Sequence, residues 1–173
     1  MSIEQLKQRI PDYAKDLRIN LGVITGSTAL TPQQAWGTAL ASAIAARSPE
    51  VVGAIAAEAA AVLSTEAEAA ARGAASIMGM NTIYYRFTHM MGHQAEYGAM
   101  PARLRMQIIG KPGVEQLDFE LWCLAASAIE GCEKCIRAHE QAVRDRGGTR
   151  EVVQDTVRIA AVINAVAITL ATA

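Results

Sequence analysis

Apolar residues recur at helical spacing along most of the chain, and no segment of useful length alternates as a half-buried strand would. The first periodic segment, residues 3–24, is broken at Pro11, where only a new helix can begin. Thr31-Pro32-Gln33-Gln34 and Ser48-Pro49-Glu50 each place a capping hydroxyl before a proline, which is typical of a helix start. The pattern predicts a helix from Pro32 to about Arg47, then a second helix after a short corner.

The pattern predicts further helices in the rest of the chain. Ser64-Thr65-Glu66 opens a long alanine-rich helix that should end before Gly92. Residues 92–101 show the least periodicity and are expected to form a surface loop, followed by a short helix over residues 101–109. Asp118 is expected to cap a helix that runs from Phe119 to about Glu130.

Two more helices complete the prediction. The cysteine-containing segment after Gly131 should form a helix that ends at Gly147-Gly148, where a left-handed residue is easily accommodated. Thr149 should start a final helix that reaches toward Thr172. All predicted elements are therefore helices.

Composition agrees with an all-α fold. Hydrophobic residues make up 51% of the chain, but much of this is alanine and only 5% is aromatic. Alanine is the best helix former, and its small side chain lets helices approach closely. With 173 residues, the chain is expected to form one compact multi-helix domain over residues 1–173.

A faint internal repeat of a helix pair is also visible. Residues 41–44 and 126–129 are both Ala-Ser-Ala-Ile, and each follows a tryptophan, Trp36 or Trp122. This register aligns Arg47 and Glu50 with Cys132 and Cys135. Chance similarity between alanine-rich segments is the alternative interpretation.

Charge and hydropathy exclude some functions. The net charge is −1 without a basic block, so we expect no nucleic-acid partner. Residues 159–173 are too short and too interrupted for a membrane span, and we expect a buried helix and no membrane association. No export signal is visible at the N-terminus, so the expected location is cytoplasmic, where three cysteines favour redox, catalytic or metal use.

The most informative segment contains Cys132, Cys135 and His139, spaced Cys-x2-Cys-x3-His. On a helix, residues i and i+3 share a face, so the two Cα atoms should lie roughly 5 Å apart, a separation that a disulfide tolerates. His139 lies one turn beyond Cys135 on that face. The first turn of a helix also favours a thiolate over a thiol.

Several kinds of site use paired cysteines. A c-type haem site requires histidine where this chain has Ile136, and a thioredoxin-like site requires a preceding strand that is not predicted here. A structural zinc site needs a fourth ligand, and neither His89 nor His93 completes a recognised spacing. Metal binding and simple packing of two small residues stay open, but a reversible dithiol is favoured, with no bound metal or cofactor.

Peroxide reduction is one reaction that a dithiol supports. One thiolate attacks the O–O bond to give a sulfenic acid, and the second thiol condenses with it to a disulfide. Proton transfer is needed for both the attacking thiol and the leaving alkoxide, and His139 can supply it. Glu120, near the start of the preceding helix, is the expected partner that orients His139.

These residues resemble the alkylhydroperoxidase D family of the carboxymuconolactone-decarboxylase-like superfamily. The resemblance is carried by Phe119-Glu120-Leu121-Trp122 and by the run from Ser127 to Glu140. Further segments extend it over nearly the whole chain; they include the N-terminus, Trp36-Gly37-Thr38, the run from Ala75 to Asn81 and the run from Leu104 to Ile109.

The resemblance implies an all-helical homotrimer that reduces organic hydroperoxides and hydrogen peroxide. It implies dihydrolipoamide as the reductant, carried on a lipoyl-bearing acyltransferase served by lipoamide dehydrogenase, and a peroxiredoxin that the protein can reduce. By position, Cys135 resembles the peroxide-attacking thiol, Cys132 the more exposed resolving thiol, and Glu120 and His139 the proton relay. Some members have histidine where this chain has Lys134.

Two other activities remain as alternatives at this point. One is a thiol–disulfide electron adaptor that serves a peroxiredoxin without significant peroxidase activity of its own. The other is a carboxymuconolactone-decarboxylase-like enzyme, whose chemistry would not need both thiols.

Overall fold

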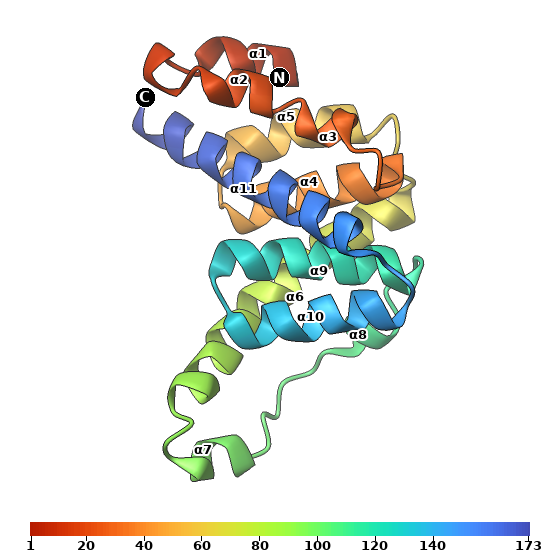
Figure 1. The fold of residues 1–173 in the computed structure, drawn as a ribbon, viewed down its shortest axis with the longest axis vertical. Coiled ribbons are helices and arrows are strands. Elements are labelled where there is room, and N and C mark those ends of the chain that lie inside the picture. Colours follow the sequence, from red (N-terminus) through yellow and green to blue (C-terminus); the bar gives the residue numbers. More distant parts are fainter.

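The computed structural model describes residues 1–173 and is entirely helical, which confirms the predicted all-α class (Figure 1). The N-terminal elements are α1 (Ile3–Arg9), a 3-10 turn (Asp12–Ala14), α2 (Asp16–Asn20) and α3 (Val23–Gly26). The middle of the chain forms α4 (Pro32–Ala45), α5 (Pro49–Ala59), α6 (Thr65–Met90), α7 (Ala95–Ala99) and α8 (Gln107–Gly110). The C-terminal part forms α9 (Gln116–Glu130), α10 (Glu133–Asp145) and α11 (Arg150–Thr172).

The core forms where α4 and α9 pack against each other, with α6 and α11 packed against both. Its largest fully buried side chains include Trp122, Phe119, Leu40 and Ile159. The indole of Trp122 lies over α4, and its Nε1–H donates to the backbone oxygen of Gln34 at 3.2 Å. Helix α9, which precedes the cysteines, is therefore held firmly from one side, while α10 packs against its other side.

The predicted helix starts are confirmed by their caps. Thr31 and Gln34 form a reciprocal capping box at α4, and the hydroxyls of Ser48, Ser64 and Thr149 accept N–H groups at the starts of α5, α6 and α11. Each cap satisfies a backbone donor that the helix itself leaves unpaired. These local signals were sufficient because each cap involves residues only three positions apart.

Three expectations between residues 92 and 130 were wrong. Residues 95–99 form the short helix α7 instead of a loop, with Tyr97 in edge-to-face contact with Phe87 of α6. Residues 101–106 are not helical, since Arg103 has a φ of +51°, a left-handed conformation that a continuing helix does not allow. Only residues 107–110, as α8, are helical there.

Asp118 does not cap α9, contrary to the prediction. The helix begins at Gln116, and Asp118 lies in its first turn. Its carboxylate accepts hydrogen bonds from the side-chain amides of Gln33 and Gln34, at 2.7 and 2.8 Å. The carboxylate thus joins α9 to α4, a long-range use that local sequence does not reveal.

Two helix corners share a local geometry that bears on the proposed repeat. Arg47 precedes α5 with a φ of +57°, and Gly131 precedes α10 with a φ of +67°. Ser48 Oγ accepts the N–H of Val51, just as Cys132 Sγ accepts the N–H of Cys135. By this geometry Ser48 corresponds to Cys132 and Val51 to Cys135. The sequence repeat had aligned Arg47 and Glu50 with the cysteines, so the structural match is shifted by one residue.

Helix α11 is long and apolar enough to cross a membrane by length and composition alone, a test that core helices also pass. Here α11 packs on α4 and α9, with Ile159, Ile163 and Val166 fully buried. At the opposite end of the molecule, α6 extends past the body and leads into α7 (Figure 1). We call residues 83–106 the projecting segment.

Candidate redox site

The corner between α9 and α10 positions the two cysteines. Gly131 ends α9 in the left-handed conformation, which glycine adopts at little cost. Cys132 then occupies the N-cap of α10, in an extended conformation, and Cys135 lies in the first turn. The predicted start of a helix at the cysteine pair is therefore correct.

The two cysteines form a disulfide, with Cα atoms 5.3 Å apart. The sulfur of Cys132 also accepts the backbone N–H of Cys135 at 3.3 Å, in the place where a serine or threonine hydroxyl would act. Because an N-cap faces the positive end of the helix dipole, the same contact favours a thiolate once the disulfide is reduced.

Exposure of the cysteines differs from the expectation that Cys132 is the more accessible sulfur. Cys132 is 0% exposed and Cys135 is 6% exposed. The reason is the N-cap geometry, which turns the Cys132 sulfur back onto the backbone of α10. In this oxidised form, Cys135 is the more accessible of the two.

The structure brings Glu120 and His139 together, as the sequence predicts. His139 Nδ1 lies 2.7 Å from Glu120 Oε2, and both side chains are buried between α9 and α10. A carboxylate can only accept, so His139 Nδ1–H is the donor. The other ring nitrogen, Nε2, lies 3.2 Å from the sulfur of Met78 on α6, and both ends of the imidazole are therefore held.

Glu120 stays ionised despite its position. Burial raises the pKa of this carboxyl group, but hydrogen bonds with His139 and Gln116 and the positive charges of His139 and Arg146 lower it further than burial raises it. The net pKa of Glu120 lies below its ordinary value of 4.5. At neutral pH the site therefore holds an ionised carboxylate against the ring of His139.

A cavity of about 220 Å³ lies against the exposed side of Cys135. Its walls are mostly apolar and come from α6, α8, α10 and the residue before α8; they consist of Met78, Asn81, Tyr85, Met106, Ile109, Lys134, Cys135, Ala138 and His139. A small apolar molecule in this cavity would lie beside both the sulfur of Cys135 and the imidazole of His139. The arrangement can hold a reactant where a thiolate and a proton-transfer group meet.

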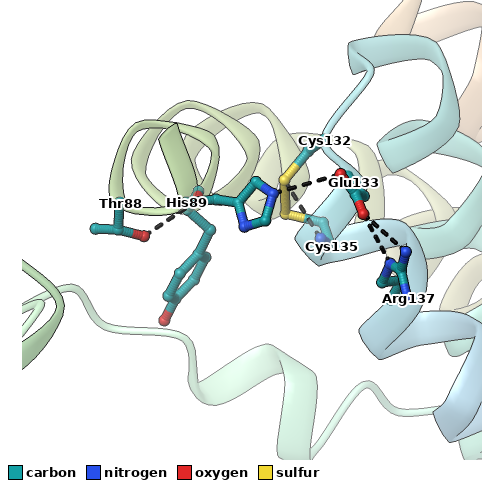
Figure 2. Close-up of polar contacts among 7 residues, drawn as sticks. Thr88, His89, Cys132, Glu133, Cys135 and Arg137 are labelled. Atoms are coloured by element: carbon teal, nitrogen blue, oxygen red, sulfur yellow. Dashed lines mark hydrogen bonds and ion pairs between the residues drawn. A yellow bond between two sulfur atoms is a disulfide. The ribbon is translucent and has the colours of Figure 1, made fainter. Parts of the chain in front are cut away.

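Charged side chains surround the cysteines on the outer face of α10 (Figure 2). Arg137 pairs with Glu133 at 2.9 Å, and His89, which extends from α6, lies 3.4 Å from the same carboxylate. The ammonium of Lys134 lies 5.2 Å from the ring centre of Tyr85, a cation–π contact. Lys134, which stands between the cysteines, thus faces the cavity mouth.

The remaining candidate residues do not extend the site. We find no group of three or more His, Cys, Asp or Glu side chains placed to hold a metal ion. His93 is exposed, and His89 interacts only with Glu133. Cys123 is fully buried, and its burial, followed by the charge of Glu120, raises the pKa of its thiol well above 9.0, so it is an unreactive thiol.

Three residues of the site were not singled out from the sequence as members of it. Gln116 donates to Glu120 at 3.0 Å, and its position one helical turn before Glu120 is a signal that could have indicated the contact. Met78 and Asn81 come from α6, far away along the chain, and only tertiary packing places them beside α10.

Comparison with known proteins agrees with this geometry. Residues 95–173 match the model of the carboxymuconolactone decarboxylase family. The chain is 57% identical to the alkyl hydroperoxide reductase AhpD of Gluconacetobacter diazotrophicus, over 98% of this chain and 93% of that protein. It is 56% identical to AhpD of Rhodospirillum centenum and 52% identical to AhpD of Streptomyces griseus, each over 98% of this chain and over 91% and 96% of those proteins. The paired cysteines lie at a helix start within the part of the chain that matches the carboxymuconolactone decarboxylase family. This chain belongs to the AhpD family.

Proposed function

We propose that the protein is an alkyl hydroperoxide reductase that works through a Cys132–Cys135 dithiol–disulfide cycle. The observation that carries this proposal is the disulfide beside an apolar cavity that His139 also lines. Relatives that share more than half of its residues are named alkyl hydroperoxide reductases. The domain that performs this chemistry comprises residues 1–173 as one unit.

Cys135 is the thiol that attacks the peroxide, since its sulfur borders the cavity and that of Cys132 does not. The thiolate attacks the terminal oxygen of the hydroperoxide, so that an S–O bond forms while the O–O bond breaks. Sulfur loses two electrons and becomes a sulfenic acid, and the other oxygen leaves as an alkoxide. The thiol of Cys132 then attacks this sulfenic acid, which releases water and leaves the disulfide.

Glu120 and His139 form the proton relay of the reaction. The carboxylate of Glu120 holds Nδ1–H, which directs the proton-transfer function of the imidazole to Nε2, beside the cavity. His139 accepts the proton of the Cys135 thiol and returns one to the leaving alkoxide. Glu120 stabilises the positive charge that the imidazole carries between these two transfers.

The disulfide needs two electrons for each turnover, and dihydrolipoamide is the proposed reductant. A lipoyl-bearing acyltransferase served by lipoamide dehydrogenase would supply it, without a bound cofactor in this protein. A peroxiredoxin is the second proposed electron acceptor. The resemblance to the family supports these partners, and so does a disulfide with one sulfur beside the cavity, where a thiolate can reach it.

The active form is proposed to be a cytoplasmic homotrimer. The projecting segment supports this, because it exposes several large apolar side chains, including Ile83, Phe87, Met90 and Met100. Ile83, Phe87 and Met90 are spaced i, i+4 and i+7 and so share one face of α6, and exposed apolar side chains that gather on one face are typical of a contact with another protein. A second copy of this chain is the partner that we propose.

One experiment tests the chemistry directly. The protein is reduced, freed of reductant and treated without oxygen with one equivalent of an organic hydroperoxide, after which peptides are mapped by mass. We expect a Cys132–Cys135 bridge that dihydrolipoamide reopens, with Cys123 unmodified. A Cys123→Ser variant should behave identically, whereas unreacted thiols at Cys132 and Cys135 would overturn the proposal.

A further inference from the structure

We propose that the side-chain amide of Asn81 binds the hydroperoxide group in the cavity beside Cys135. This inference rests on the proposed function and adds a substrate-binding residue to it. Asn81 belongs to α6, and its backbone oxygen lies 4.0 Å from the sulfur of Cys135. The residue lines the cavity and is only 4% exposed.

The amide of Asn81 is unusual because its oxygen is buried without any hydrogen-bond partner. Most buried polar groups are paired, and an unpaired one destabilises a fold. Four other buried oxygens lack a partner, but all are hydroxyls, on Thr38, Ser42, Ser127 and Thr156. None of these four residues lines the cavity, so Asn81 is the one residue that both carries a buried polar atom without a partner and lines the cavity.

Each of the other titratable or hydroxyl side chains of the cavity, apart from the cysteine, has a neighbour within the protein that it contacts. His139 is held by Glu120 on one nitrogen and by Met78 on the other. The hydroxyl of Tyr85 points to the sulfur of Met106, and the ammonium of Lys134 lies over the Tyr85 ring. Among the residues that line the cavity, only Asn81 has a buried side-chain oxygen or nitrogen without a hydrogen-bond partner.

A hydroperoxide matches an amide in its hydrogen-bonding groups. Its single O–H needs an acceptor, which is the carbonyl oxygen of Asn81, and its inner oxygen can accept from the amide N–H. As Cys135 attacks the outer oxygen, negative charge develops on the inner oxygen, which leaves as an alkoxide. An N–H directed at that oxygen stabilises the charge before His139 completes the proton transfer.

The test separates binding of the O–O group from reactivity of the thiol. The second-order rate constant of the reduced protein with tert-butyl hydroperoxide is compared with the rate at which iodoethane alkylates Cys135. Iodoethane reports thiolate formation and access but has no hydrogen-bonding group. For Asn81→Ala we expect the peroxide rate constant to fall about a hundredfold to about a thousandfold, as when one such donor is removed elsewhere, with alkylation within about twofold.

Two further variants control for folding. Asn81→Leu keeps a similar volume and removes the unpaired polar atom, so its melting temperature should not fall although its peroxide reaction slows. Thr82→Val is the matched control on the same helix, because its buried hydroxyl bonds within α6, to the Met78 carbonyl, and does not line the cavity. Its peroxide rate constant should equal that of the wild type.

Four results would overturn the assignment of Asn81. In the first, the peroxide rate constant of Asn81→Ala equals that of the wild type. In the second, it falls only in step with alkylation, which would mean that Asn81 affects the reactivity of the Cys135 thiol and not peroxide binding. Asn81→Leu could lose stability and retain the peroxide rate, which would make the role structural. If the wild type itself forms no Cys132–Cys135 disulfide with the hydroperoxide, the proposed function fails and the assignment fails with it.

Discussion

At the scale of single residues, the protein keeps a charged carboxylate almost completely out of water. Glu120 is ionised because His139 and Gln116 hydrogen-bond to it, and this arrangement fixes which imidazole nitrogen faces the cavity. The pair joins α9 to α10, and in the proposed mechanism it also sets the direction of proton transfer.

The first prediction concerns the dependence of stability on pH. The pKa of Glu120 is lower in the folded protein than its ordinary value of 4.5, so the unfolded chain binds the proton more tightly. The stabilisation from ionised Glu120 is then present above about pH 4.5 and is lost as the pH falls through the folded pKa. Urea unfolding of the wild type and Glu120→Gln should show a difference that shrinks over this range. A difference that stays constant from about pH 6 to about pH 3 would contradict the assignment.

A second prediction concerns His139. His139→Gln removes the proton-transfer group and retains a side chain of similar size, so the attack of Cys135 on peroxide should slow by about a hundredfold. Stopped-flow kinetics with tert-butyl hydroperoxide measures this rate, and circular dichroism checks the fold. His93→Gln, at an exposed position far from the cavity, is the control. Normal kinetics in His139→Gln would remove the residue from the relay.

Sequence was informative for residues whose partners lie nearby along the chain. The spacing of Cys132, Cys135 and His139 predicted one helical face, and Glu120 followed from an antiparallel partner helix. The contacts of Met78 and Asn81 could not be predicted, because α6 reaches the site only through the packing of the whole bundle. The order of cysteine exposure was wrong for a similar reason, since it depends on the exact N-cap geometry.

At the scale of helices, the close approach of α4 and α9 depends on a single missing side chain. A Cβ atom at Gly37 would overlap the indole of Trp122, which is fully buried. The indole cannot move without breaking its hydrogen bond to Gln34. Gly37 therefore fixes the position of α9 and, through it, the position of Glu120.

This predicts opposite effects for two glycine substitutions in neighbouring helices. Gly37→Ala should lower the free energy of unfolding by about 1–3 kcal/mol because it overpacks the core. Gly53→Ala, at an exposed position in α5 with nothing near its Cβ, should raise it by about 0.5–1 kcal/mol through helix propensity. Urea denaturation measures both. Equal effects of the two substitutions would contradict this account of the α4–α9 contact.

Helix starts were predicted correctly at the capping residues Thr31, Ser48, Ser64 and Thr149, but not at Asp118, whose carboxylate bonds to α4 instead. Helix prediction failed between residues 92 and 110, where short helices are stabilised by contacts such as that of Phe87 with Tyr97. Such segments have too few residues for a periodic signal. Their conformation is determined by what they pack against.

At the scale of the whole molecule, the projecting segment exposes several large apolar side chains, among them Ile83, Phe87 and Met90. If a second copy covers it, as we propose, Phe87→Glu should convert the trimer of about 55 kDa, three times 18.4 kDa, into the monomer. Sedimentation velocity measures the change. Tyr13→Glu, on an exposed aromatic residue in the N-terminal 3-10 turn, should leave the trimer intact. A wild-type protein that sediments as a monomer would refute the assembly.

The burial of the disulfide has a consequence for the cell's supply of electrons. Cys132 is fully buried and Cys135 is 6% exposed beside a mostly apolar cavity of about 220 Å³, so a reductant has to enter this cavity to reach the disulfide. If dihydrolipoamide is the reductant, as proposed, its slender apolar chain should reach the sulfur more readily than a larger, charged thiol such as glutathione. Met106→Ala, which removes part of the cavity wall, should raise the rate of reduction by glutathione more than the rate of reduction by dihydrolipoamide. The walls of one small cavity would then select the class of thiol that supplies electrons to the enzyme.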